Sequence, residues 1–145
     1  MNLKFRKLHP DAILPAYQSA GAACFDLHAL ETVWGIPYGA PLTIRTGLAV
    51  EIPEGHAMLI FSRSGHGFKN DTRLANCVGV IDADYRGEIA VRLTRDASCN
   101  GQLYVTAGDR IAQAMVIAVP RAAIVLVDSL SETERGTGGF GSTGA

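Results

Sequence analysis

Residues 79–89 read GVIDADYRGEI, which is a short apolar run, a polar turn and the start of a second apolar run. This pattern is typical of a β-hairpin, because Asp and Gly form tight turns between β-branched strands. Similar short runs recur on both sides of it, separated by Gly, Pro, Asn and Asp. They predict strands at residues 3–6, 25–30, 42–45, 48–52, 57–61, 77–81, 88–93, 103–106, 111–119 and 124–127.

The fold expected from these strands is an all-β, single-domain, jelly-roll-like β-barrel. A barrel of this kind buries two sheet faces and limits exposed strand edges. Only residues 63–69 suit a short helical turn, and the glycines at 65 and 67 weaken it. We therefore expect at most one short helix.

The composition limits which partners and which cellular compartment can be expected for this protein. The chain has 145 residues, of which 48% are hydrophobic, and this is enough for one domain with its own core. The 13 basic and 14 acidic side chains leave a charge of −1, which gives no reason to expect nucleic acid or an anionic membrane as a partner. The apolar runs are too short for a membrane span or a signal peptide, and Cys24, Cys77 and Cys99 cannot all pair. We therefore expect a cytoplasmic protein.

Residues 132–145, ETERGTGGFGSTGA, are rich in glycine and hold one aromatic residue. Such a segment cannot pack a core, so we expect a flexible C-terminal arm after a domain that spans residues 1–131. Its glycine spacing imitates the dinucleotide and P-loop fingerprints, but no βαβ unit surrounds it, and Ser142 stands where a P-loop has lysine. Two interpretations remain: a disordered tail, which composition alone favours, or a segment whose N–H groups and hydroxyls bind phosphate.

Three further segments hold side chains that suit chemistry. Asp82 directly follows an apolar strand, so it is either a general base for water or a residue that merely starts the turn. Arg63, Ser64 and Gly65 could present a guanidinium, a hydroxyl and N–H groups to an anion. Gln113 interrupts an apolar strand and must find hydrogen bonds there, or it costs roughly 1–3 kcal/mol.

Five segments, taken in order, resemble the five motifs of the trimeric deoxyuridine triphosphatases (dUTPases). They are AGAACFDL at 20–27, RSG at 63–65, Asn76 with GVIDADYRGEI, GDRIAQ at 108–113 and RGTGGFGSTG at 135–144. The resemblance implies a jelly-roll homotrimer that hydrolyses dUTP to dUMP and pyrophosphate with magnesium, limiting uracil entry into DNA and supplying dUMP for thymidylate synthesis. It also implies three sites, each built from motifs of all three chains, with the arm closing over a neighbouring subunit's site.

The resemblance assigns the nucleoside to the third motif. Tyr85 would lie beneath the deoxyribose and leave no space for a 2′-hydroxyl. Asn76 would read the uracil edge together with the hairpin backbone. The backbone positions implied are Val80, Ile81 and Ala90. A site built for particular edge atoms rejects other bases strongly, because its own buried groups would go unpaired.

The resemblance assigns the reaction and the phosphates to the second, third and fourth motifs. Asp82 would orient and deprotonate the water that attacks the α-phosphorus. Ser64 and the N–H of Gly65 would hold the phosphates and the leaving oxygen. Arg63 and Gln113 would bind more of the triphosphate.

The arm and the metal complete the implied site. Arg135 would meet the γ-phosphate and Phe140 would stack on the uracil, with further donors in Gly141, Ser142 and Thr143. Magnesium would be carried mainly by the substrate phosphates, as suits an ion that keeps its waters, with Asp26 in contact only through water. Arg110 is interpreted as a structural ion-pair residue, with a phosphate contact as the alternative.

The sequence departs from the family's pattern at three positions. Ser62 stands where the second motif usually has proline, His66 where it has an apolar residue, and Cys24 where the first motif commonly has glycine. These departures put local backbone geometry in doubt but remove no group assigned to chemistry. His66 is interpreted as a solvated loop residue.

One segment matches none of the motifs. Residues 31–41, which include Trp34 and Tyr38, are expected to form a surface loop or a trimer contact whose aromatic residues could meet a partner.

Two other functions fit the same fold. A dCTP deaminase-like relative would direct the acid and its water to the base. A nucleotide-binding regulatory protein would bind dUTP without turning it over.

Overall fold

The computed structural model describes residues 1–36, 41–95 and 103–139. Within these ranges the regular structure is almost entirely strand, with one short helix. In chain order the elements are β1 (Lys4–Lys7), β2 (Ala16–Tyr17), β3 (Phe25–His28), β4 (Val33–Ile36), β5 (Leu42–Arg45), β6 (Leu48–Glu51), β7 (His56–Phe61), α1 (Ser64–Asn70), β8 (Thr72–Leu74), β9 (Gly79–Ile81), β10 (Ala90–Arg95), β11 (Leu103–Val105) and β12 (Arg110–Ala118).

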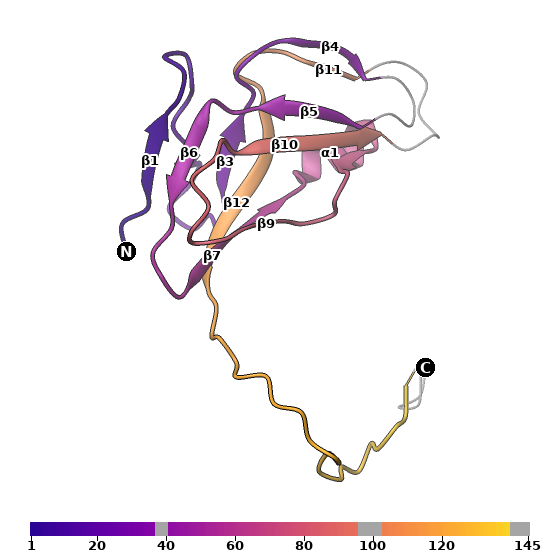
Figure 1. Cartoon of the computed structure of the whole chain (residues 1–145). Helices are drawn as coiled ribbons and strands as arrows, with labels where there is room; N and C mark the ends of the chain where they lie inside the picture. The colour runs from indigo at the N-terminus through magenta and orange to yellow at the C-terminus, as the bar shows by residue number, and fades with distance from the viewer. Residues whose placement is uncertain (37–40, 96–102, 140–145) are drawn as a thin grey trace.

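The strands form two main antiparallel sheets and two ribbons (Figure 1). The larger sheet has the order β2-β3-β12-β7-β9, and the smaller has the order β5-β10-β8. The ribbons pair β1 with β6 and β4 with β11. This order places β12 between β3 and β7, so three of the sequence motifs lie on neighbouring strands or at their ends.

The core lies between the inner faces of the sheets and follows the two-residue alternation of the strands. In β12, Ala112 and Ala114 are fully buried and Gln113 between them is half-exposed. Met58 of β7 and Ile44 of β5 are also fully buried. Each large apolar side chain removed from water in this way contributes about 1.5–3 kcal/mol. The expected all-β, jelly-roll-like fold with one short helix is confirmed.

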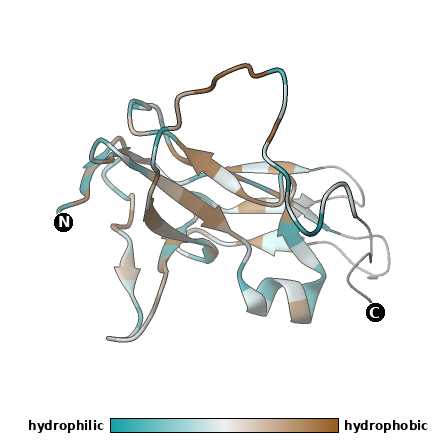
Figure 2. Cartoon of the chain, turned by 90° about the horizontal axis from the view of Figure 1, so that it is seen from below, coloured by the Kyte–Doolittle hydropathy of each residue, from teal (hydrophilic) through white to brown (hydrophobic). Residues whose placement is uncertain are grey.

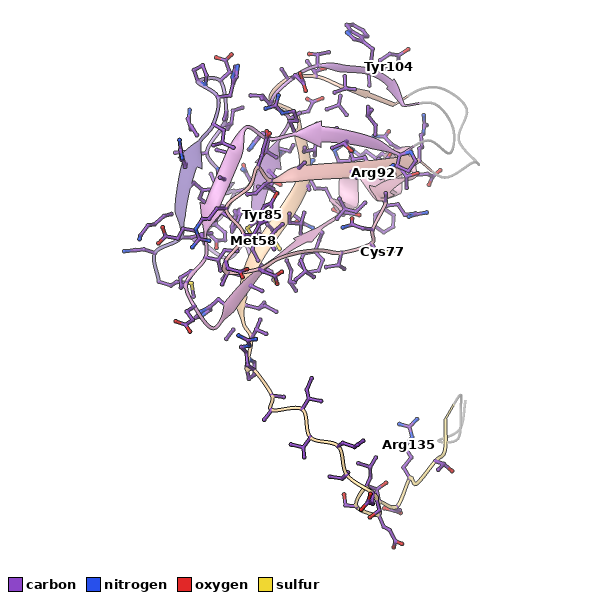
Figure 3. The ribbon with its side chains drawn as sticks, viewed as in Figure 1. Met58, Cys77, Tyr85, Arg92, Tyr104 and Arg135 are labelled. Carbon is purple, nitrogen blue, oxygen red and sulfur yellow. The ribbon has the colours of Figure 1, made fainter. Side chains whose placement is uncertain are left out.

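The prediction of a surface loop at residues 31–41 is wrong in part, because residues 33–36 form β4 and pair with β11. The ring of Trp34 packs edge-on against that of Tyr104 on β11, with centroids 5.9 Å apart (Figure 3). Trp34 remains 78% exposed, so this ribbon does present aromatic surface to solvent. Tyr38 lies outside the described residues.

The chain leaves the body of the domain after β12 (Figure 1). Residues 119–139 contain no strand, so the strand expected at 124–127 is wrong for the single chain. Ile124 is 99% exposed and Leu126 is 98% exposed. Figure 2 shows the apolar colour of this segment lying outside the sheets. Among the described residues, no helix has the length and apolarity that crossing a membrane requires.

Candidate active site

The hairpin after β9 presents Asp82. β9 pairs with β7, and the backbone N–H of Tyr85 donates to the Asp82 carbonyl at 3.2 Å, which closes a tight turn. The Asp82 side chain is exposed and lines a cleft of about 620 Å³. Other charged or titratable residues of this lining are Glu54, His56, Asp84, Arg86 and Arg121. A carboxylate held on a closed turn and open to water is the arrangement that a general base needs.

Tyr85 is held in place by its own hairpin. Its Oη donates to the Glu88 carbonyl at 3.0 Å, and its ring lies directly over Gly87. A Cβ on Gly87 would lie 2.5 Å from Tyr85 Cζ, so a glycine is required beneath the ring. The Glu88 carboxylate in turn accepts from the Gly47 N–H at 2.8 Å and from Arg45 Nε at 3.0 Å. The hairpin is therefore tied to the β5–β6 turn and does not depend on substrate for its shape.

Asn76 lies at the base of the same hairpin. Its carbonyl accepts from the Val78 N–H at 2.7 Å across Cys77, whose φ of 63° is in the left-handed region. The side-chain Nδ2 of Asn76 lies 3.7 Å from the position of a Cβ on Gly79. Asn76 thus faces the strand on which Val80 is 60% exposed. Asp82 and Tyr85 therefore share one closed turn, and Asn76 lies beside β9, the strand that leads into it. Of the predicted backbone positions, Val80 and Ile81 lie on β9 and Ala90 begins β10.

A second group of the expected residues surrounds Asp26 on β3. Asp26 is 7% exposed, and its two carboxylate oxygens are shared between two guanidinium groups. Arg63 Nε donates to Oδ1 at 3.1 Å and Arg110 Nη1 donates to Oδ2 at 3.2 Å. The ion pair expected for Arg110 is therefore present. Since both oxygens already have cationic partners, this carboxylate does not suit direct coordination of a metal ion.

Gln113 finds the hydrogen bond that its place in an apolar strand requires. It lies opposite Asp26 in the β12–β3 register, and its Nε2 donates to the Ser62 carbonyl at 3.0 Å. The Ser62 Oγ accepts from the Leu74 N–H at 2.9 Å. A serine in place of the family's usual proline therefore joins the end of β7 to β8.

The Arg63-Ser64-Gly65 turn leads into α1 with unused donors. The Arg63 carbonyl accepts from the N–H groups of His66 and Gly67, both at 3.1 Å, and Arg63 makes no side-chain cap. The first N–H groups of a helix have no partner inside it. Ser64 and Gly65 are exposed, so their N–H groups are placed to bind an anion.

His66 is not the solvated loop residue that was expected. Its Nε2 lies 2.7 Å from the Arg110 carbonyl oxygen, and its Nδ1 is buried. Sequence reasoning missed this contact because it joins α1 to a strand that follows 44 positions later. Gly87 and Glu88, which hold Tyr85, were also missed, although the turn chemistry around them was visible.

The charges around Asp26 affect two neighbouring groups. Burial lowers the pKa of His28, with Arg110 and Arg63 adding to the shift and Asp26 opposing it. Burial raises the pKa of the Cys24 thiol, and the nearby Asp26 carboxylate raises it further. Both groups are therefore held toward their neutral forms.

The lining of the Asp82 cleft does not include the group around Asp26. The residues that line the Asp82 cleft include none of Asp26, Arg63, Ser64 and Gln113. Arg135 lies far from both, on the extended segment, where its Nε donates to the Gly138 carbonyl at 2.9 Å (Figure 3). The predicted residues Phe140, Gly141, Ser142 and Thr143 lie outside the described residues. The described residues also contain no cluster of three or more His, Cys, Asp or Glu suited to a metal ion.

Comparison with known proteins identifies the family. The sequence model of the dUTPase family matches residues 10–144. The chain is 48% identical to the deoxyuridine 5′-triphosphate nucleotidohydrolases of Picosynechococcus sp. and Nautilia profundicola, in each case over 99% of both chains. Among solved structures, it resembles the Staphylococcus bacteriophage 80alpha dUTPase with dUPNHPP, with a TM-score of 0.85 and 26% identity over 99% of both chains. From its sequence, its fold and these likenesses, the chain belongs to the dUTPase family.

Proposed function

We propose that this protein hydrolyses dUTP to dUMP and pyrophosphate. Its relatives at 48% identity are named for this activity, and the motif that would carry it is formed here. The single observation that carries the proposal is the exposed carboxylate of Asp82, held next to the fixed ring of Tyr85 on one closed hairpin. The deaminase alternative is not favoured.

In the proposed reaction, water attacks the α-phosphorus and the bond to the bridging oxygen breaks. Asp82 orients the water and takes its proton, while the electron pair of the broken bond leaves with pyrophosphate. Ser64 and the N–H of Gly65 hold the phosphates and the leaving oxygen. Arg63 and Gln113 bind further phosphate oxygens. Among the described residues, Arg63 uses two of its five N–H donors, for Asp26 and for the Arg110 carbonyl, so other donors can bind phosphate.

The hairpin supplies the selectivity. Asn76 and the backbone at residues 80, 81 and 90 read the uracil edge, and the closed turn leaves no room for a thymine methyl or a cytosine amino group. Tyr85 supports the deoxyribose and excludes a 2′-hydroxyl. Glu88 holds the ring there through the hydrogen bond from Tyr85 Oη to its carbonyl, and Gly87 leaves room for the ring beneath it.

The working form is a homotrimer with shared sites. Two observations support this: the lining of the Asp82 cleft includes none of the Asp26 group, and residues 124–130 expose Ile124, Leu126 and Leu130 almost fully. Exposed apolar area costs roughly 25 cal/mol per Å², so such a segment is stable only against another surface. In the trimer, residues 1–131 form the barrel and the arm at 132–145 closes over a neighbour's site. Arg135 then meets the γ-phosphate and Phe140 the uracil.

Magnesium enters with the substrate. The donor chemistry fits, because Asp26 is a hard oxygen donor whose oxygens are already paired and can reach the ion only through water. When bound, magnesium offsets charge on the phosphates. A phage phi11 dUTPase of the same fold, at 24% identity and a TM-score of 0.79, is described with a structural Mg(II) ion.

The cytoplasm is the proposed location. Cys24 and Cys77 are free thiols, as suits a reducing compartment.

The test is pyrophosphate release from dUTP, dTTP, dCTP and UTP with magnesium, by the wild type and by Asp82→Asn. We expect turnover of dUTP alone, with a loss of at least about 100-fold in the variant, since a general base contributes roughly 10²–10⁴-fold. Ammonia release from dCTP would support the deaminase. Tight dUTP binding without turnover would support the regulatory protein. Rapid turnover of dTTP would contradict the account of base selection.

A further inference from the structure

His66 makes a hydrogen bond whose direction is unambiguous. Its Nε2 lies 2.7 Å from the Arg110 carbonyl oxygen, and a carbonyl only accepts, so Nε2 carries the proton. Nδ1 is buried, with no hydrogen-bond partner among the described residues. The His66 ring in the first turn of α1 therefore donates this hydrogen bond to the backbone at the start of β12.

The same carbonyl is part of a closed network. It also accepts from Arg63 Nη1 at 3.0 Å, so both of its lone pairs are used. Arg63 Nε reaches Asp26, and Asp26 reaches the side chain of Arg110. The network therefore fixes both ends of the Arg63-Ser64-Gly65 turn: Arg63 through its guanidinium, and the first turn of α1 through His66.

The helix α1 is held at its C-terminal end, where the Asn70 carbonyl accepts from Arg95 Nε and from Thr72 Oγ1, both at 3.0 Å. It is seven residues long, contains Gly65 and Gly67, buries none of its residues and has no side-chain cap at Arg63. Helices this short are unstable without tertiary contacts, and interior glycines destabilise them further. The backbone carbonyl of His66 also accepts the N–H of Asp71, which ends the helix. His66 thus anchors both its own turn and the closing turn.

We infer that His66 is a positioning residue for the triphosphate. Its Nε2–H holds the first turn of α1 against β12, which aims the Ser64 and Gly65 N–H groups at the phosphates. This rests on the proposed function, since Ser64 and Gly65 are assigned there to phosphate binding. Among the described residues, no hydrogen bond or ion pair joins this ring to the hairpin that carries Asp82 and Tyr85 or to Asn76. The effect of His66 should therefore grow with the number of phosphates on the ligand.

The test compares His66→Gln, His66→Asn and His66→Leu in the full-length chain. A glutamine amide places its N–H near the position of Nε2, whereas an asparagine amide is too short and leucine has no donor. His9→Leu is the control, because His9 is exposed and its side chain bonds only to Asp11 among the described residues. Dissociation constants for dUpNHpp and for dUMP are measured by calorimetry, and unfolding temperatures are recorded for every variant.

We expect the Asn and Leu variants to bind dUpNHpp roughly fivefold to tenfold more weakly, which is the scale of one lost hydrogen bond. The constant for dUMP should change less than about twofold in the same variants, and the Gln and His9→Leu variants should bind both ligands as the wild type does. Equal weakening by Gln and Asn would overturn the inference, and so would an equal loss for dUpNHpp and dUMP. If the leucine variant does not fold, the comparison of the Gln variant with the Asn variant still tests whether the donor at Nε2 is needed. A failure of the proposed function is distinguishable from a failure of this inference, because only the former predicts that the wild type does not turn over dUTP.

Discussion

Replacing Gly87 by alanine tests whether the fixed ring of Tyr85 selects deoxyribose. The new Cβ would lie 2.5 Å from Cζ and 3.0 Å from Cε2 of Tyr85, whereas ordinary contacts begin near 3.4 Å. The ring must therefore swing out by about 1 Å or more, and it can, because Tyr85 is 43% exposed. Its hydrogen bond to the Glu88 carbonyl is lost in the process.

The expected effect on stability is small. One lost hydrogen bond costs about 1 kcal/mol, and replacing glycine by alanine returns roughly 0.4–1 kcal/mol through the unfolded chain. The effect on sugar selection is large, because a displaced ring no longer fills the space of a 2′-hydroxyl. We expect the ratio of kcat/KM for dUTP to that for UTP to fall by at least about tenfold, which corresponds to roughly 1.4 kcal/mol of lost discrimination.

Steady-state pyrophosphate release with the two substrates measures this ratio, and urea unfolding measures stability. Tyr85→Ala provides the matched background, because without a ring Gly87→Ala should change the ratio no further. A Gly87→Ala protein that discriminates between dUTP and UTP as well as the wild type would refute the reasoning. So would a further loss in the Tyr85→Ala background.

Asp26→Asn leaves two guanidinium groups without their carboxylate, and since both are partly exposed we expect a loss of about 1–3 kcal/mol in the free energy of unfolding by urea. An unchanged midpoint would contradict this. Burial lowers the pKa of His28 in the folded chain, so on acidification the unfolded chain binds the proton first. The free energy of unfolding should therefore fall as the pH drops below about 6.5, and His28→Gln should reduce that fall. Urea unfolding of both proteins at pH 7.5 and pH 5 measures the difference. Replacing Ile124 and Leu126 by aspartate should dissociate the proposed trimer, with a monomer mass by light scattering and little dUTP turnover. A wild type that is itself monomeric would remove the shared-site proposal.

Much of the fold follows from local patterns. The strand at 42–45 has the predicted bounds, and the other predicted strands that form differ by one or two residues at an end, because two-residue alternation and turn residues act locally. Residues 33–36 were not predicted as a strand because VWGI, among glycines and prolines, has no alternation to mark it. The segment at 124–127 has the opposite problem: its apolar run is typical of a strand, but its own chain supplies no partner for it.

The family motifs are visible in the sequence itself. The roles proposed for Asn76, Asp82 and Tyr85 are visible with them, because these residues lie within ten positions of one another. Only the tertiary structure joins Asp26 to Arg63 and to Arg110, across 37 and 84 positions. It also gives His66 its carbonyl partner. The physical reason is that a β-sheet pairs segments regardless of their separation along the chain, so side-chain proximity depends on strand order and register, which no local pattern specifies.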